Sequence, residues 1–217
     1  MIGNPVNYDK KDLKYFAHSC VSNLDSNLKK YLTLLPGKEV LDIGIGKGHN
    51  SIVLSSLGYN VTGVDYSKKS LDIVKDSCSD IKLFQSDIRN FEIEPNIFDL
   101  IMSVNVLHFL HKDDASIIFD DVKNKLKVNG LVYISVFSIS DPSLKFMSEN
   151  HSFEILDNNI AHKLDDNTYF SYFSKDEILK SFHDFKTIFV SDVCCLDLGP
   201  GKPHYHGVIN YIGQKIN

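Results

Sequence analysis

The chain has 217 residues, of which 43% are hydrophobic and 24% are charged, and its formal net charge is −5 at pH 7. This length is enough for one domain with a buried core, and the composition is ordinary for a globular protein. The negative charge disfavours nucleic acid as the main partner. No stretch approaches the roughly 20 apolar residues of a membrane helix, and the first residues, MIGNPVNYDKKDLKYF, lack the apolar segment of a signal peptide.

The four cysteines are Cys20, Cys78, Cys194 and Cys195. They form no C-x-x-C pattern, and a bridge between the adjacent pair would be strained. Unbridged cysteines are typical of reducing compartments, so we expect a cytoplasmic protein. No cluster of cysteines or carboxylates has the spacing of metal ligands, and we expect no metal.

The predicted elements begin with an amphipathic helix. Apolar residues recur at three- and four-residue spacing from Leu13 to Leu35, and Pro36–Gly37 ends the segment. Apolar runs then predict strands at residues 39–44, 60–66, 81–87, 98–110 and 131–138, the fourth of them running into a loop. The helices predicted after the first one cover residues 49–58, 67–78, 112–130 and 174–184.

Capping and stop residues set several of these boundaries. Gly58 is a typical helix-terminating glycine, and Ser67 and Ser174 are typical N-caps. Asn129–Gly130 is expected to close the helix over residues 112–130.

Near-continuous apolar strands that alternate with helices predict a parallel sheet covered on both faces. The last two predicted strands, residues 185–198 and 204–216, are joined by the turn sequence GPGKP, so we expect an antiparallel hairpin. The predicted fold class is therefore α/β: a doubly wound, Rossmann-like, seven-stranded sheet, mostly parallel with an antiparallel last strand and helices on both faces. We expect residues 1–217 to form a single domain. Residues 138–173 show no clear period and are expected to be an insert.

A glycine-rich loop follows the first strand, in the sequence VLDIGIGKGHN at residues 40–50. A phosphate-binding P-loop would need GxxxxGK followed by Ser or Thr, which is missing here. The dinucleotide pattern would need a small residue at position 49, where this chain has His49. Asp42 would repel a phosphate but attract an ammonium or a sulfonium, which favours S-adenosylmethionine. The alternative, that Asp42 only holds a turn of its own loop, stays open.

Acidic residues also end the second and third strands. Asp65 lies about 20 residues after the first glycine, where an acid contacts ribose hydroxyls in adenosine-binding folds. It could instead be a charge at the N-terminus of the next helix. Asp87 can accept from an adenine amino group while Ile88 lines the ring.

These motifs together resemble class I S-adenosylmethionine-dependent methyltransferases over residues 38–137. The resemblance rests on VLDIGIGKG, VTGVDYS, QSDI and FDLIMSVNVLHFL. AHSCV and VNVLHFL are further similar to small methyltransferases of the tellurite-resistance type. Two departures stand out, because that family usually has Cys-Gly at Ile45–Gly46, and its carboxyl end carries a His-Arg pair where this chain has GKPHYHGVINYIGQK. The substrate end of that family is therefore not transferable.

The resemblance implies which residues would contact the cofactor. Asp42, Gly44 and Gly46 would hold its methionine portion, Asp65 its ribose, and Asn105 would lie near the transferable methyl group. The full set of cofactor-binding residues implied is His18, Asp42, Gly44, Ile45, Gly46, Asp65, Tyr66, Asp87, Ile88 and Asn105. The helical segment over residues 1–36 would cover the cofactor, which is S-adenosyl-L-methionine with S-adenosyl-L-homocysteine as product.

The substrate side centres on His204 and His206 in PHYHGV, which lie on one side of a strand because they are two residues apart. They could be a general base and an acceptor clamp, half of a metal site, or surface histidines near a turn. We take His204, His206 and Asn105 as the candidate catalytic residues. His108 could flank the acceptor or simply lie at the start of a helix.

Residues 138–173 would form a lid whose aromatic side chains exclude water, although a packed core would need the same residues. We expect methyl transfer to a small-molecule acceptor by a monomer or homodimer, with no nucleic-acid or membrane partner. The alternatives are an NAD-dependent oxidoreductase and a non-catalytic module that binds S-adenosylmethionine.

Overall fold

The computed structural model describes residues 26–92, 94–156, 159–197 and 204–217. Its strands are β1 (Glu39–Ile43), β2 (Asn60–Asp65), β3 (Lys82–Gln85), β4 (Phe98–Val104), β5 (Leu126–Phe137), β6 (Phe153–Leu156), β7 (Ile160–Lys163), β8 (Thr168–Ser171), β9 (Phe185–Asp197) and β10 (His204–Lys215). Its α-helices are α1 (Ser26–Tyr31), α2 (His49–Ser56), α3 (Lys68–Ser77), α4 (Lys112–Lys125), α5 (Pro142–Ser148) and α6 (Lys175–Ser181). Short 3-10 helices are η2 (Leu32–Leu34), η3 (Ile88–Asn90) and η4 (Leu107–Phe109).

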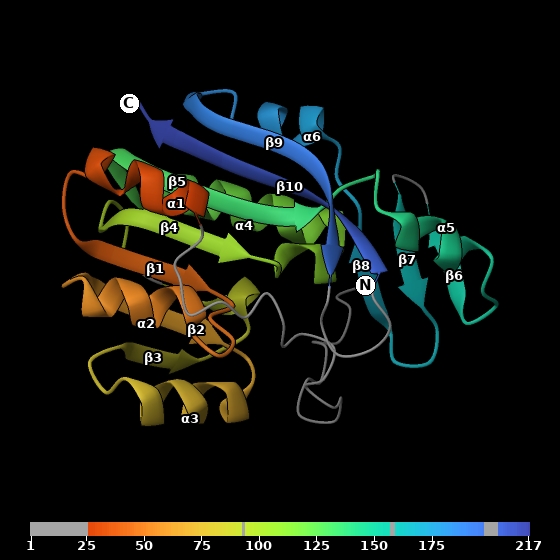
Figure 1. The fold of residues 1–217 in the computed structure, drawn as a ribbon, viewed down its shortest axis with the longest axis horizontal. Coiled ribbons are helices and arrows are strands. Elements are labelled where there is room, and N and C mark those ends of the chain that lie inside the picture. Colours follow the sequence, from red (N-terminus) through yellow and green to blue (C-terminus); the bar gives the residue numbers. More distant parts are fainter. Residues whose placement is uncertain (1–25, 93, 157–158, 198–203) are drawn as a thin grey trace.

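Seven strands form one sheet in the order β3-β2-β1-β4-β5-β10-β9. The first five pair in parallel, whereas β10 is antiparallel to both β5 and β9. In Figure 1 the arrowheads of β1, β4 and β5 point to the same end of the sheet, where the smaller part of the molecule with β6–β8 also lies. This topology confirms the doubly wound α/β fold with an antiparallel last strand.

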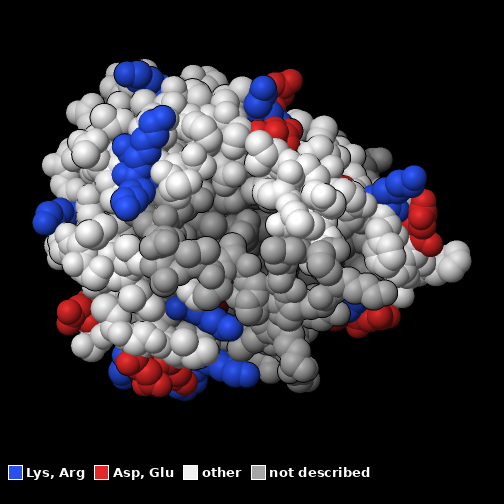
Figure 2. Space-filling view, in the orientation of Figure 1, with Lys and Arg blue, Asp and Glu red and all other residues white. Residues whose placement is uncertain are grey.

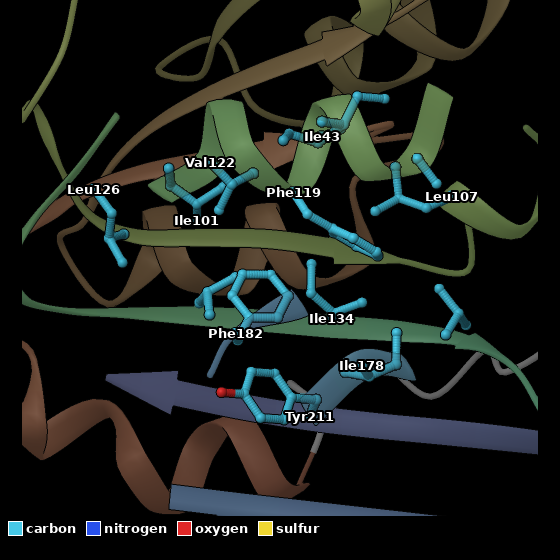
Figure 3. Close-up of a cluster of buried hydrophobic side chains, with 14 of the residues drawn as sticks. Ile43, Ile101, Leu107, Phe119, Val122, Leu126, Ile134, Ile178, Phe182 and Tyr211 are labelled. Atoms are coloured by element: carbon cyan, nitrogen blue, oxygen red, sulfur yellow. The ribbon is translucent and has the colours of Figure 1, made fainter. Parts of the chain in front are cut away.

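Alternating side chains of the central strands supply a core on each face of the sheet. Leu41 and Ile43 pack on the side of α4 and α6, whereas Val40 packs on the side of α1, α2 and α3. Figure 3 shows the first cluster, with Phe119 of α4 and Phe182 of α6 directed at the strands. Burial on both faces explains why the strand sequences are almost continuously apolar.

Most predicted boundaries are confirmed. Gly58 follows α2 with φ +83°, Ser67 caps α3 by accepting from the Ser70 amide, and Ser174 forms a capping box with Glu177. The predicted first helix is present from Ser26 onward, and its earlier residues lie outside the described ranges.

The prediction that Asn129–Gly130 closes the helix from residue 112 is wrong, because α4 ends at Lys125 and β5 begins at Leu126. The Lys215 ammonium donates to the Lys123 and Leu126 carbonyls, and the Ile97 amide donates to that of Lys125. Partners from other elements therefore satisfy the helix C-terminus before the glycine is reached. Asn129 has φ +66° inside β5, where the register with β4 shifts, so the Asn-Gly pair marks a bulge rather than a helix end.

Residues 138–173 contain more regular structure than the sequence indicates. They hold α5 and a three-stranded antiparallel sheet in the order β6-β7-β8. Each of these strands has only four residues, which is too short for a period to stand out. A bridge from Ser138 to Phe173 and a hydrogen bond from the Ser171 hydroxyl to the Leu110 carbonyl attach this sheet to the main one. The GPGKP turn lies at residues 199–203, outside the described ranges. Among the helices of the described ranges, none has both the length and the apolar character needed to cross a membrane.

We predict that Phe119→Ala lowers the free energy of unfolding by about 3–5 kcal/mol, because it opens a cavity in the core beneath α4. Phe119 is 2% exposed and contacts the rings of Phe173 and Phe182. Ile117→Ala is the matched control, since Ile117 lies in the same helix but is 64% exposed. Urea denaturation measures both, and equal losses in the two variants would contradict the core assignment.

Candidate cofactor and acceptor site

The glycine loop after β1 needs glycine for two physical reasons. Gly44, Gly46 and Gly48 all have positive φ, at +72°, +53° and +71°, a region that other residues adopt at a cost. A Cβ atom on Gly44 would also lie 2.4 Å from a methyl group of Val106, in the loop after β4. The glycine loop is therefore pressed against the loop that carries Asn105.

The third glycine explains why the helix after the loop tolerates His49. Gly48 is the N-cap of α2, and a Cβ there would lie 2.9 Å from a Val74 methyl group of α3. His49 begins α2 with its side chain exposed. The residue that must be small for α2 to pack beneath the loop is therefore Gly48. In the dinucleotide pattern the corresponding small residue would be at position 49.

Asp42 is a buried acid directly beneath the glycine loop. It is 6% exposed, and the Ser51 hydroxyl of α2 donates to its Oδ2 at 2.6 Å. Burial raises its pKa to about 7, the Ser51 hydrogen bond opposes that rise, and the nearby charge of Asp65 adds to it. The interactions that set this pKa include no cation. The site would therefore gain from a positively charged ligand group.

Asp65 ties the end of β2 to the glycine loop. Its Oδ2 accepts from the Gly46 amide and its Oδ1 accepts from the Ser67 amide, both at 2.8 Å. Asp65 therefore fixes the backbone on both sides of its own strand end, at Gly46 and at Ser67. Tyr66 follows with 38% of its surface exposed, whereas the Ile45 side chain is only 6% exposed and packs against Gly63. Ile45 can therefore offer a ligand little beyond its backbone.

Asp87 has a partner that the sequence reading did not assign. The Arg89 guanidinium bonds both of its oxygens and also reaches Asp114 of α4 at 3.2 Å. Burial alone would raise the pKa of Asp87, but the hydrogen bonds and charge of Arg89 outweigh it and hold that pKa below its usual range. The carboxylate is thus kept ionised and oriented at the end of β3, and Ile88, half-buried in η3, follows it.

Asn105 lies immediately after β4 in the left-handed region, with φ +58°. Its amide nitrogen donates to the Ser135 carbonyl, and its side-chain oxygen accepts from the Ser135 hydroxyl at 3.2 Å. Two contacts with β5 therefore fix this residue at the carboxyl edge of the sheet.

His206 makes a short contact with a buried carboxylate. Its Nδ1 lies 2.9 Å from Oδ2 of Asp141, the N-cap of α5, and Asp141 is 3% exposed. Its Nε2 lies 2.9 Å from Nε2 of His204, which is exposed. The sequence analysis did not single out Asp141. The only signal was an Asp-Pro pair in SISDPSL, which is typical of a helix start.

His108 lies in η4 and is 1% exposed. Within the described ranges neither of its ring nitrogens has a hydrogen-bond partner. It stacks on Phe137 at 3.7 Å between centroids, and Phe137 also stacks on His206 at 5.1 Å. Burial lowers the pKa of His108 to about 3, with the nearby His206 lowering it further and Asp141 opposing, so the ring is neutral near pH 7.

The structure therefore brings the predicted residues to one edge of the sheet, in two groups. The acids and glycines lie at or just after the carboxyl ends of β1, β2 and β3, and the histidines lie beside the end of β5. His18 falls outside the described ranges. No group of three or more histidine, cysteine or acidic residues suited to a metal ion occurs in the described part of the chain.

Figure 2 shows the face of the molecule that Figure 1 presents. The lysine and arginine side chains of the described residues are scattered over it and do not gather into a patch. The face is hollowed near its centre.

Comparison with known proteins agrees with this geometry. Residues 40–130 match the family described as "Methyltransferase domain". Over 95 residues the chain is 30% identical to the probable S-adenosyl-L-methionine-dependent methyltransferase TehB of Haemophilus influenzae. That match spans 42% of this chain but only 33% of the relative's length.

Solved structures with the same fold include TehB of Haemophilus influenzae, with a TM-score of 0.69 and 21% identity over 93% of this chain and 64% of that one. The PH0226 protein of Pyrococcus horikoshii has a TM-score of 0.71 and 18% identity, over 98% of this chain and 100% of that one. A Burkholderia thailandensis 1,6-didemethyltoxoflavin-N1-methyltransferase, solved with bound 1,6-didemethyltoxoflavin and S-adenosylhomocysteine, has a TM-score of 0.60 and 17% identity. The likeness covers 82% of this chain and 71% of that one.

The family match covers residues 40–130, and together with the fold it makes the chain similar to class I S-adenosylmethionine-dependent methyltransferases, in agreement with the motifs. Within that class it is similar to TehB, in agreement with the narrower resemblance seen in the sequence.

We predict that Asp42→Asn stabilises the ligand-free protein increasingly as the pH rises. The pKa of Asp42 is about 7 in the folded state and about 4 in the unfolded state. Between these pH values only the folded protein holds the proton, so the free energy of unfolding of the wild type falls as the pH rises from about 4 to about 7. The variant avoids this cost, which reaches up to about 4 kcal/mol at pH 8.5. Urea denaturation at pH 4.5 and 8.5 measures the change.

The matched control is Asp72→Asn, because Asp72 is exposed on α3 and pairs with Lys68 at the surface. Its effect should be small at both pH values. An identical effect of Asp42→Asn at pH 4.5 and pH 8.5 would show that the carboxyl titrates normally.

Proposed function

We propose that the protein transfers the methyl group of S-adenosylmethionine to a small-molecule acceptor. The observation that carries this proposal is the buried Asp42 carboxyl beside Asp65, beneath a glycine loop, with no cation among the interactions that set its pKa. A ligand that brings positive charge to this point relieves the cost of the two neighbouring acids, whereas a diphosphate would increase it. This argument disfavours the alternative of an NAD-dependent oxidoreductase.

The cofactor residues divide by the part of the ligand they would hold. We propose that Asp42, Gly44 and Gly46 face the methionine portion, with the Ile45 backbone between them. Asp65 and Tyr66 would face the ribose. Asp87 would accept from the adenine amino group while Ile88 lines the ring, and its ion pair with Arg89 supports an ionised acceptor. His18 remains proposed from the resemblance alone.

The cofactor supplies an already activated methyl group, so the protein's task is alignment and exclusion of water. Asn105 is fixed to β5 by two hydrogen bonds, which supports a role near the reacting atoms. His206, with His204 beside it, is the candidate base at the acceptor end. Residues 138–173 would form the lid, and Phe170, which contacts Phe109 at 5.6 Å, would be part of its apolar lining.

A small acceptor is supported by the scattered basic side chains in Figure 2, which offer no track for a nucleic-acid backbone on that face. One of the proteins with a similar structure is also a 1,6-didemethyltoxoflavin-N1-methyltransferase with 1,6-didemethyltoxoflavin bound. We propose a single domain, acting as a monomer or homodimer in the cytoplasm. Cys78 and Cys194 carry free thiols, which supports a reducing compartment.

We predict that S-adenosylmethionine binds and releases a proton from Asp42. At pH 7 this carboxyl is about half protonated, so a cationic ligand that lowers its pKa should release about half a proton, and affinity should rise with pH. Titration calorimetry in buffers of different ionisation enthalpy measures the number of protons released on binding. Asp42→Asn isolates this proton, because the amino group of the ligand titrates in both proteins.

Asp42→Asn should also bind the cofactor at least about tenfold more weakly, whereas Asp72→Asn should match the wild type. NADH should give no heat. Binding of NADH without binding of S-adenosylmethionine or S-adenosylhomocysteine would overturn the proposal. Release of labelled methyl to a panel of thiols, amines, phenols, halides and metalloid oxyanions then separates an enzyme from a module that only binds the cofactor.

A further inference from the structure

The ring of His206 is held from three sides. Its Nδ1 contacts Asp141, its face stacks on Phe137 at an interplanar angle of 11°, and the next residue, Gly207, donates its amide to the same Asp141 oxygen. Gly207 is required for this approach, because a Cβ there would lie 2.5 Å from the Asp141 amide nitrogen. The histidine is therefore oriented by buried neighbours rather than placed at random near a turn.

Asp141 also decides which nitrogen of His206 carries the proton. Its Oδ1 accepts from the amide and hydroxyl of Ser143, and its Oδ2 accepts from Gly207 and His206. Burial alone would raise the pKa of Asp141, but these hydrogen bonds and the charge of His206 hold that pKa below its usual range. An ionised carboxylate can only accept, so Nδ1 of His206 must be the donor. The lone pair of the neutral ring then lies on Nε2.

His204 connects this lone pair to the surface. The two Nε2 atoms are 2.9 Å apart, so a single proton lies between them. The His204 side chain is exposed, whereas that of His206 is 25% exposed. Because Nε2 of His206 is the acceptor of this pair, Nε2 of His204 carries the shared proton, and a proton that arrives at His204 displaces it onto His206.

The acceptor end and the cofactor end share one loop. His108 stacks on Phe137, which stacks on His206, and it lies two residues from Val106, which packs against Gly44. The other titratable groups near His206, taken from each element around it, are His204 on β10, Asp141 at α5, His108 in η4, Tyr172 after β8, and Asp192 and Cys195 on β9.

We infer that Asp141 is a positioning residue that makes His206 the general base, and that the acceptor is a molecule whose attacking atom carries a proton at neutral pH. This inference rests on the proposed function. It favours acceptors with an O–H, an N–H or an undissociated thiol over halides, metalloid oxyanions and thiolates, which attack without losing a proton.

In the reaction, the acceptor atom forms a bond to the methyl carbon as the carbon–sulfur bond of the cofactor breaks, and that bonding pair goes to sulfur. The acceptor's proton moves to His204 as the proton shared between the two Nε2 atoms moves onto His206, whose ring becomes an imidazolium stabilised by Asp141. The same relay in reverse then returns the proton through His204 to solvent. The products are the methylated acceptor, S-adenosylhomocysteine and one proton, so charge and atoms balance.

The test of the positioning role is nitrogen NMR of the full chain labelled in histidine, with His206→Gln to assign the signal. His206 should be protonated at Nδ1, and Asp141→Asn should lower its pKa by about one unit or more, because a charged partner is lost. Asp192→Asn is the matched control, since Asp192 bonds Ser140 of the same loop. A His206 protonated at Nε2, or equal pKa values in both variants, would overturn the inference.

Asp141 also caps α5, so a variant at an exposed position guards against misfolding. His204→Gln should shift the titration of His206 without loss of structure. An unchanged titration would contradict the proposed proton transfer between His204 and His206. S-adenosylhomocysteine binding is measured alongside by calorimetry. Failure of the wild type to bind it refutes the proposed function, whereas normal binding with a wrong His206 result refutes only this inference.

The test of the acceptor class compares catechol and aniline with thiophenolate and iodide, using labelled S-adenosylmethionine. At pH 8, Asp141→Asn should lower kcat for the first pair by about 100-fold and leave the second pair almost unchanged. In the wild type, kcat for catechol should fall below the pKa of His206. Turnover restricted to iodide and thiophenolate, or an equal loss on all acceptors, would contradict the acceptor class.

Discussion

A carboxyl group buried near the end of an inner strand is the constraint on which the site depends. Asp42 is the penultimate residue of β1, with β2 on one side and β4 on the other, and it is only 6% exposed. Ser51 supplies one hydrogen bond, and Asp65 adds a second acid that ties down the glycine loop through the Gly46 amide. The fold bears this cost in the ligand-free state, and a cationic ligand is what removes it.

The two halves of the site are joined by packing. Gly44 has no room for a side chain because Val106 fills that space, and Asn105 next to it is bonded twice to Ser135 of β5. Three residues after Asn105, His108 stacks on Phe137 at the end of the same strand. A shift of the glycine loop would therefore be felt at the histidines, which gives a rigid basis for aligning a methyl donor with an acceptor.

The parts that sequence reasoning predicted are those whose physics is local. Continuous apolar strands indicate a sheet covered on both sides, and Ser67, Ser174 and Gly58 act through their own backbone neighbours. The errors came from distant partners. Lys215 contacts the end of α4 from near the end of the sequence, and Asp141 meets His206, which is 65 positions away in the sequence. No periodicity or spacing reports such contacts. The four-residue strands β6–β8 were not predicted for a different reason, because so few residues cannot show an alternation of apolar and polar side chains.

The direction of β10 explains why histidines near the end of the chain lie at the ligand edge of the sheet. Parallel strands bring their carboxyl ends to that edge, so a residue near the chain terminus would normally reach it only through a loop. Because β10 is antiparallel, its first residues lie there instead. Its pairing with β5 begins at Val208, so His204–Gly207 extend past the end of β5 and pair only with β9 on that side. This overhang places His206 above the Ser138–Asp141 loop, where the N-cap of a short helix becomes the partner of its imidazole. The antiparallel strand thus sets an imidazole at the edge of the sheet where the acids and the glycine loop lie, without any insertion into the parallel core.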